Sequence, residues 1–357
     1  MAENKTEQAK QLLVRYIHDT QMERGEKLPG QDYFRRKFNY GTTTIGAAIK
    51  QLQKDGVLKV KDKIGAYLLN PNANGHISRT IALTAVHLED SMFYSTVASF
   101  LLTKLMERGC LMRLFYCENP GVKLECSLDD FQGLRRCIDN GEIQGIIHID
   151  DFCKETESFL HENHIPSISL GGGNTASAKC GIFINQLGTM LKGAKILRDI
   201  GIKRPAVMLN KTLYKHFKKE FELIISDTWG SLPPNSFYYA YNEYGGRNIA
   251  WDYINLPQNQ RPDGMIILDD IVGGAFTSEL AIHLNKEELP LCVVMRNKQM
   301  NIPFSLPKVV YFDVDLAAFS EKAVNIIFKA IKCNIMDSGY NVFDPELNLK
   351  ESTIRLN

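Results

Sequence analysis

Residues 28–68 carry two short helix patterns followed by a tight hairpin pattern, and this order constrains the fold more than any other feature of the chain. Phe34 and Phe38 lie four residues apart, which gives a short first helix one apolar stripe. The turn at 39–41 interrupts that helix. The second helix has apolar residues at the i, i+3, i+4 and i+7 spacing, namely Ile45, Ala48, Ile49 and Leu52. Two short helices joined by so tight a turn predict a helix-turn-helix.

The second helix has recognisable ends, and a hairpin follows it. The threonines at 42–44 offer N-cap hydroxyls, and Asp55-Gly56 ends the helix because glycine readily adopts the left-handed conformation found there. Residues 57–61 and 66–69 then alternate as two strands. A helix-turn-helix whose second helix presents polar groups outward is how many proteins enter the DNA major groove. The hairpin would be its wing.

This stretch resembles the DNA-binding domain of the GntR family of bacterial transcription regulators. The family pattern runs roughly LPSER, then LA, F, VSR, TVR, AL, L and G at fixed spacings, with G-x-G-x-F in the wing. The matching positions are Leu28-Pro29, Phe38, the run from Tyr40 to Ile45, Ala48-Ile49, Leu52, Gly56 and Gly65-Ala66-Tyr67. The resemblance covers about 65 residues. It implies a winged helix that binds double-stranded operator DNA, and a winged helix used only for protein contacts is the alternative.

The family usually has arginine at three base-reading positions, where this chain has Asp32, Thr42 and Gly46. Arginine makes the commonest bidentate contact to guanine, worth about 1–3 kcal/mol of discrimination. The operator is therefore expected to differ from the usual family operator, with Asp32 either accepting from cytosine or facing solvent. The residues predicted to contact DNA are Arg35, Arg36, Tyr40, Thr42, Thr43, Thr44, Lys50, Lys61 and Lys63. The basic ones would contact phosphates, which positions a protein without specifying sequence.

Charge is unevenly distributed. Residues 1–70 hold 13 Lys or Arg against 8 Asp or Glu, whereas the whole chain has a net charge of only +1. A basic N-terminal module on a mildly acidic body fits attraction to phosphate at one end. The eight cysteines include no CxxC pair, which suits reduced thiols. Without an apolar signal core or a run near the ~20 apolar residues of a membrane span, a cytoplasmic protein with no membrane contact is expected.

Beyond residue 70 the pattern changes to strand–helix alternation. Residues 70–75, Asn-Pro-Asn-Ala-Asn-Gly, are the clearest linker, so we expect a winged-helix domain at 1–70, a linker at 71–77 and a body at 78–357. Strand patterns cover 80–87, 111–117, 145–149, 166–170, 181–184, 205–209, 237–241, 264–268, 291–295 and 309–312. Helix patterns cover 94–107, 129–140, 154–163, 188–200, 214–228, 245–255, 274–284 and 316–332. This predicts an α/β body of two lobes, each a doubly wound parallel sheet, with crossings near 171–178 and 290–313.

The body resembles the effector domain of the LacI family and of sugar-binding periplasmic proteins. The matching segments are 78–82 with 90–94, 143–147, 165–168, 184–188, 200–204 and 261–264. GntR heads joined to such bodies form a known subfamily of sugar-responsive repressors. The resemblance therefore implies a homodimeric transcription regulator, expected to be a repressor. Its operator affinity would be controlled by a sugar or sugar derivative bound between the two lobes.

Ligands of such bodies bind beyond the carboxyl ends of the strands. The predicted effector-binding residues there are Phe93, Tyr94, Asp150, Asn185, Lys218, Asp270 and Arg296, with Asp151 and Asp269 beside them. Aromatic rings would stack on the apolar face of a sugar, and charged groups would bond its hydroxyls. Arg296 stands where the family usually has aspartate, which hints at an anionic effector such as a uronate or sugar phosphate. Ordinary surface polar groups are the alternative at each position.

Two motifs that look catalytic do not fit their motif's context. Gly171–Asn174 resembles a phosphate-binding loop but lies between two strand patterns instead of opening a helix. His161 and His164 are separated by only two residues, so they do not form the HExxH zinc motif. No catalytic residue, metal ligand or cofactor is predicted. A solute-binding protein without DNA regulation, disfavoured by the winged helix, and a sugar-modifying α/β enzyme, disfavoured by the missing nucleophile elbow, are the alternatives.

Overall fold

The computed structural model divides the chain into two compact units. One comprises residues 1–86, 102–167 and 326–337, and the other comprises 87–101, 168–325 and 338–357. The structure describes residues 5–20, 22–23, 25–55, 57–61, 64–69, 80–86, 92–117, 125–139, 142–149, 152–163, 165–171, 180–333 and 339–354. In this described part of the chain, no helix is both long and apolar enough to cross a membrane.

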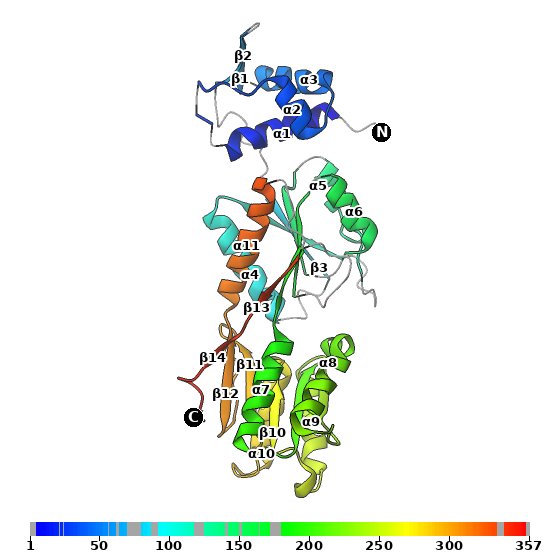
Figure 1. The fold of residues 1–357 in the computed structure, drawn as a ribbon, viewed down its shortest axis with the longest axis vertical. Coiled ribbons are helices and arrows are strands. Elements are labelled where there is room, and N and C mark those ends of the chain that lie inside the picture. The colour runs from blue at the N-terminus through cyan, green and yellow to red at the C-terminus, as the bar shows by residue number, and fades with distance from the viewer. Residues whose placement is uncertain are drawn as a thin grey trace. The chain divides into compact units, whose positions relative to one another are not determined.

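The N-terminal domain has the two short helices and the hairpin predicted within 28–69, and a longer helix precedes them (Figure 1). These elements are α1 (Lys5–Asp19), α2 (Gln31–Phe38), α3 (Thr42–Lys54), β1 (Leu58–Lys61) and β2 (Gly65–Leu68). The apolar stripes meet in one core, in which Phe34, Ile45 and Leu52 are fully buried. An extended segment before α2 lies beside β2, since Leu28 N donates to Ala66 O at 2.8 Å. This third segment of the wing was not predicted from the sequence.

The ends of α3 differ from the prediction. Gly41 is the N-cap residue, its carbonyl accepts from Ile45 N at 3.1 Å, and no side chain caps this end of the helix. The threonine-cap prediction was therefore wrong: Thr42–Thr44 already form the first turn, so their hydroxyls lie one step too far along the chain. Asp55 is the C-cap in a right-handed conformation, and Gly56 lies outside the described residues.

Two six-stranded sheets build the body, in the orders β13-β7-β6-β5-β3-β4 and β14-β12-β11-β10-β8-β9. The strands are β3 (Thr80–Ala85), β4 (Leu111–Tyr116), β5 (Gly145–His148), β6 (Ser167–Leu170), β7 (Cys180–Ile184), β8 (Pro205–Asn210), β9 (Phe237–Ala240), β10 (Gly264–Ile267), β11 (Leu291–Asn297), β12 (Val309–Val314), β13 (Gly339–Phe343) and β14 (Glu346–Asn348). The described pairings are parallel apart from β12 with β14. The predicted α/β class is confirmed, whereas β13 and β14 were not predicted.

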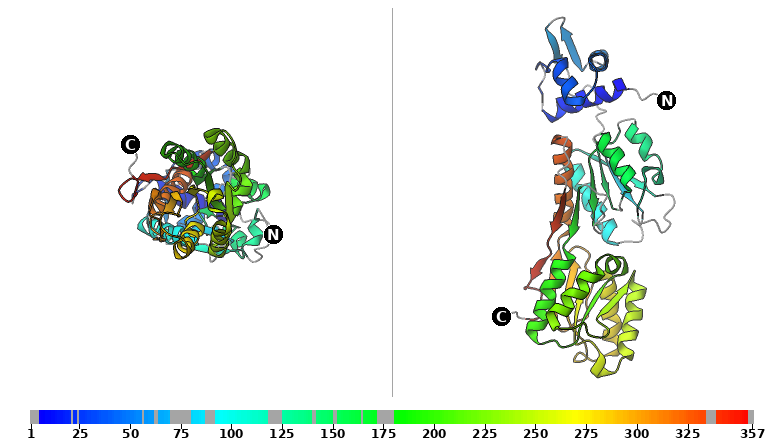
Figure 2. Two further views of the ribbon diagram at one scale, coloured as in Figure 1. Left: turned by 90° about the horizontal axis from the view of Figure 1, so that it is seen from below. Right: turned by 45° about the vertical axis from the view of Figure 1, so that its right-hand side comes forward.

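Helices cover both faces of the second sheet (Figure 2). The body helices are α4 (Met92–Glu107), α5 (Leu134–Asp139), α6 (Lys154–Glu162), α7 (Gln186–Ile200), α8 (Lys211–Trp229), α9 (Glu243–Asn255), α10 (Asp270–His283) and α11 (Leu316–Cys333). A Cβ at Gly193 of α7 would lie 3.4 Å from Ile266, and one at Gly273 of α10 would meet Ile267. Because neighbouring residues of a strand point to opposite faces, α7 and α10 lie on opposite sides.

Two predictions about the body were wrong. The single helix expected at 129–140 is a short turn at Leu128–Asp130 followed by α5, with Gly133 between them at φ +75°. The chain also crosses between the sheets elsewhere than expected. The strands on either side of 171–178, β6 and β7, belong to the same sheet, and of that range only residue 171 is among the described residues. The range 290–313 contains β11 and most of β12 of the second sheet. Buried strands of both sheets have the same apolar pattern, so sequence alone does not assign a strand to its sheet.

Candidate DNA-binding face and effector-binding residues

The exposed faces of α2 and α3 carry most of the predicted DNA-binding residues. Arg35, Arg36 and Lys50 are exposed on these two helices. Thr42 and Thr43 are exposed at the start of α3, and Thr44 is half-buried. Arg35 Nε lies 3.5 Å from Asp32 Oδ1. A surface pair of this kind contributes about 0–1 kcal/mol, so a phosphate can readily replace Asp32 as the partner.

The positions where the family carries arginine have room for a long side chain. The Asp32 side chain is 77% exposed. A Cβ at Gly46 would lie 3.7 Å from the Gln31 side chain, which is an ordinary van der Waals distance. Thr42 is also exposed, so an arginine side chain would fit at each of the three positions. Lack of space therefore does not explain why the chain has no arginine there.

Two residues of the predicted set have contacts within the domain. The Tyr40 hydroxyl donates to Gln8 Oε1 at 2.8 Å and so ties the turn to α1. Lys61 is exposed on β1, with its ammonium 4.9 Å from the centre of the Tyr67 ring. Gly65 has φ +129°, and a Cβ there would lie 2.8 Å from Lys27 Cε, so the wing requires glycine at this position. Lys63 lies outside the described residues.

Phe93 and Tyr94 occupy the first turn of α4, in the connection that follows β3. Their rings meet edge to face at 5.1 Å, and Phe93 also lies 6.4 Å from Phe319. A Cβ at Gly171, just past β6, would lie 3.7 Å from the Tyr94 ring. The structure therefore places both rings at the predicted edge of the first sheet. Asp150 and Asp151 lie outside the described residues.

Asn185 is the N-cap of α7. Its Oδ1 accepts from Gly188 N at 2.8 Å, and its Nδ2 donates to Asp344 Oδ1 at 2.6 Å. A capping side chain typically contributes about 1 kcal/mol to a helix. These contacts give Asn185 a structural role in joining α7 to the chain after β13.

Asp269 and Asp270 follow β10 at the carboxyl edge of the second sheet. Asp269 caps α10 by accepting from Val272 N at 3.0 Å, and burial raises its pKa. Asp270 is only 4% exposed and accepts from the backbone N of Asn297 at 2.8 Å and from its Nδ2 at 2.9 Å. Burial raises the pKa of Asp270 to about 7. The Asp270 carboxylate thus joins α10 to the end of β11.

Arg296 is paired within its own lobe. Its Nε donates to Asp313 Oδ1 at 2.7 Å, its Nη2 donates to Glu351 Oε2 at 2.6 Å, and its guanidinium lies 3.9 Å from the centre of the Tyr311 ring. Two carboxylates therefore balance this charge, and the reason for expecting an anionic effector from Arg296 is lost.

Lys218 does not lie at a strand end, contrary to its prediction. It is seven residues beyond the start of α8, which is about 10 Å along a helix. Its exposed Nζ is 3.8 Å from Glu222 Oε1. The reason is that α8 begins directly after β8, earlier than the sequence pattern indicated.

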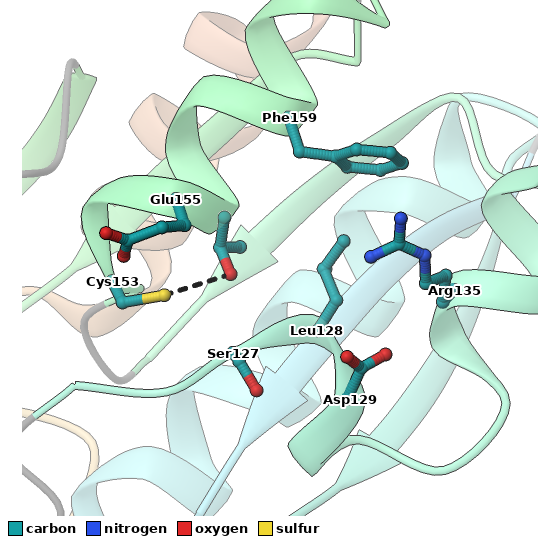
Figure 3. Close-up of a pocket in the computed structure, with 8 residues that line it drawn as sticks. Ser127, Leu128, Asp129, Arg135, Cys153, Glu155 and Phe159 are labelled. Carbon is teal, nitrogen blue, oxygen red and sulfur yellow. Dashed lines mark hydrogen bonds between the residues drawn. The ribbon is translucent and has the colours of Figure 1, made fainter.

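Two pockets in the described residues are lined by none of the predicted effector-binding residues that the structure describes. One of about 140 Å³ is lined by Ser127, Leu128, Asp129, Arg135, Cys153, Glu155, Thr156 and Phe159 (Figure 3). The other, of about 350 Å³, lies at the amino ends of β8, β10 and β11. Four of its charged groups are paired with one another, with Arg204 3.6 Å from Asp263 and Arg261 3.5 Å from Glu288.

Sequence reasoning missed a cluster at the carboxyl ends of β8 and β9. Lys211 follows Asn210, which pairs with Ala240 in the parallel register. The Lys211 ammonium lies 5.9 Å and 5.3 Å from the ring centres of Tyr239 and Tyr241. These rings are 42% and 56% exposed. Two tyrosines spaced by two at the end of a predicted strand were the available signal.

Residues 5–68 match the model of the family described as bacterial regulatory proteins, gntR family. No curated protein matches the chain. The solved structures similar to it include the Lac repressor bound to ONPG in its repressed state, at 10% identity, a TM-score of 0.63, and coverage of 86% of this chain and 88% of that one. The transcriptional dual regulator Cra from Pseudomonas putida with fructose 1-phosphate has 13% identity, a TM-score of 0.60, and coverage of 78% and 100%. The regulator CelR with cellobiose has 15% identity, a TM-score of 0.59, and coverage of 89% and 94%. At these identities the likeness shows the fold.

Proposed function

From a gntR-family domain at residues 5–68 on a body with the fold of LacI-type regulators, we propose that the chain is a DNA-binding transcription regulator controlled by a small sugar-like effector. The family match of the winged helix carries the proposal. The sugar ligands of the similar structures, fructose 1-phosphate, cellobiose and ONPG, support a carbohydrate as the effector class. We retain 1–70, 71–77 and 78–357 as head, linker and body, and a cytoplasmic location.

The winged helix would read DNA with the start of α3 in the major groove. The exposed hydroxyls of Thr42 and Thr43 can bond phosphates, and their methyl groups can contact thymine. Arg35, Arg36 and Lys50 are exposed cations at phosphate-contacting positions, and Lys61 extends the positive surface to the wing. Such contacts position the head, whereas the α3 side chains would carry the sequence preference.

The effector would bind at the carboxyl ends of the body strands, where Phe93 and Tyr94 offer two adjacent rings. A homodimer formed through the body would place two winged helices on a roughly palindromic operator. An effector that favours one dimer geometry would change the spacing of the heads, with a coupling of about 1–3 kcal/mol. We expect effector binding to weaken DNA binding, as in a repressor that leaves its operator when the effector is present.

Salt titration of operator binding tests the head. We expect affinity to fall as salt rises, because phosphate contacts release counterions. Arg36→Ala should weaken binding to all sequences and reduce the slope of log K against log salt by about 1. Lys218→Ala, which removes an exposed cation of the body, is the control and should leave the slope unchanged. Selection of bound fragments from genomic DNA supplies the operator, and fluorescence anisotropy then measures the affinity and its slope against salt. The same anisotropy assay with sugars added tests whether an effector changes DNA binding. DNA binding that no sugar alters would contradict the effector part alone.

Restoring the family arginines tests whether the operator preference is unusual. The double variant Thr42→Arg, Gly46→Arg should shift the preferred sequence toward guanine-containing sites, by about 1–3 kcal/mol for each bidentate contact. Gly46→Ala is the control, since it gains about 1 kcal/mol of helix stability without a guanidinium. Selection from a random DNA library reads the preference. A double variant that binds the native operator more tightly with the same preference would contradict an unusual readout.

A further inference from the structure

We propose that Lys211, Tyr239 and Tyr241 form an effector subsite for an acidic group, the phosphate or carboxylate of an anionic sugar. This inference rests on the proposed function and names the chemical class of its effector. It assigns to Lys211 the anion-binding role that the sequence suggested for Arg296.

Position is the first argument. Asn210 and Ala240 are the last residues of β8 and β9 and are paired in parallel register. Lys211 and Tyr241 directly follow them, so both residues emerge at the carboxyl edge where ligands of parallel α/β sheets bind. Tyr239 lies in the edge strand β9 and Tyr241 directly follows that strand, and their ring centres lie 5.9 Å and 5.3 Å from the Lys211 ammonium. The cluster therefore sits where a ligand is expected.

Charge is the second argument. At this end of the second sheet, the charge of Arg296 is neutralised by Asp313 and Glu351. The Asp269 carboxylate accepts from the N–H of Val272, and that of Asp270 accepts from Asn297. Among the described residues, Lys211 forms no ion pair, and its recorded neighbours are the two tyrosine rings. Within the described part of the chain, a half-buried cation without a counter-ion is thus placed at the edge where a ligand is expected.

Chemistry is the third argument. Lys211 is the first residue of α8, whose partial positive N-terminus disfavours a cation and favours an anion. A bound phosphate or carboxylate would compensate both charges and accept charge-assisted hydrogen bonds, which are about twice as strong as neutral ones. The tyrosine rings hold the ammonium in place through cation–π attraction. Their exposed remainder offers a stacking surface for the ring of a sugar.

Lysine acetylation of the full-length protein, followed residue by residue by mass spectrometry, tests this assignment. The probes are inorganic phosphate, glucose 6-phosphate, glucuronate and glucose at equal ionic strength. We expect at least one of the three anions to slow modification of Lys211, and glucose to have no such effect. Lys218, on the same helix but beside Glu222, is the internal control and should react at one rate throughout. Phosphate and carboxylate sources are distinguished by which anion protects.

Variants then connect the residue to affinity. Lys211→Met should weaken binding of the protecting anion about 10- to 100-fold by calorimetry. Lys211→Arg should retain most of it, and Lys218→Met should retain all of it. Unchanged thermal unfolding would show that the variants are folded. Lys211 acetylation unaffected by every anion, or anion binding unaffected by Lys211→Met, overturns the subsite. DNA release by glucose and by none of the anions would overturn the subsite while leaving the proposed function standing. A chain that binds no DNA would overturn the proposed function while leaving the subsite standing.

Discussion

Replacing Phe34 by alanine is expected to unfold the winged-helix domain and abolish DNA binding while the body stays folded. Phe34 is fully buried, and its ring lies 5.0 Å from Tyr16, 5.2 Å from Tyr33 and 5.5 Å from Phe38. Truncating a buried phenylalanine costs about 3–5 kcal/mol. A domain of this size has a total stability of only about 3–10 kcal/mol, so the loss is comparable to the whole.

Two observables separate the head from the body in this experiment. Both tryptophans, Trp229 and Trp251, belong to the body, so their fluorescence reports body unfolding alone. Helical circular dichroism reports both parts. In Phe34→Ala, urea should melt part of the helical signal early while the fluorescence transition stays at the wild-type concentration. Tyr33→Ala is the matched control, since Tyr33 is 44% exposed on the same helix. DNA binding of wild-type strength by Phe34→Ala would contradict the expectation.

The winged helix was predictable because its information is local. Apolar spacing identified Phe34, Ile45 and Leu52 as core, and each is fully buried. The prediction of a threonine N-cap for α3 was wrong because threonine and glycine both occur at the N-cap position, and the choice between them depends on where the chain turns. The segment at 26–28 that pairs with β2 was missed because its residues have no strand pattern, and pairing comes from contacts distant in sequence.

The body shows the same division between local pattern and distant contact. Strand–helix alternation predicted parallel sheets, but periodicity does not say which sheet receives β7 or β13. The sequence pattern identified candidate residues at strand ends, but it did not reveal what those residues contact in the fold. The sequence does not reveal that Arg296 meets Asp313 and Glu351, because Glu351 is 55 residues away. Lys211 was missed for the converse reason: its significance lies in having no carboxylate partner among the described residues, which depends on the fold and not on local sequence.

The second large effect concerns pH and Asp270. Burial raises the pKa of this carboxyl from 3.8 to about 7, despite the N–H bonds it accepts from Asn297. Between these two values the folded state holds a proton that the unfolded state has released. Stability from this group is therefore fully present below pH 4 and is lost as pH rises through 7. At 1.36 kcal/mol for each unit of pKa, the loss in the free energy of unfolding is on the order of 4 kcal/mol.

Asp270→Asn isolates that contribution, because the amide is nearly isosteric and does not titrate. The difference in unfolding free energy between Asp270→Asn and wild type should be small at pH 4 and should favour the variant increasingly up to pH 8. Asp315→Asn is the control of opposite sign. Burial tends to raise the Asp315 pKa, but the N–H of Ala318 and the amide of Gln299 hold it below its usual value. The Asp315 variant should therefore lose stability relative to wild type as pH rises through the acid range. Urea titrations at fixed ionic strength measure both differences. A pH-independent difference for Asp270→Asn would mean that the structure stabilises the ionised carboxylate as well as water does.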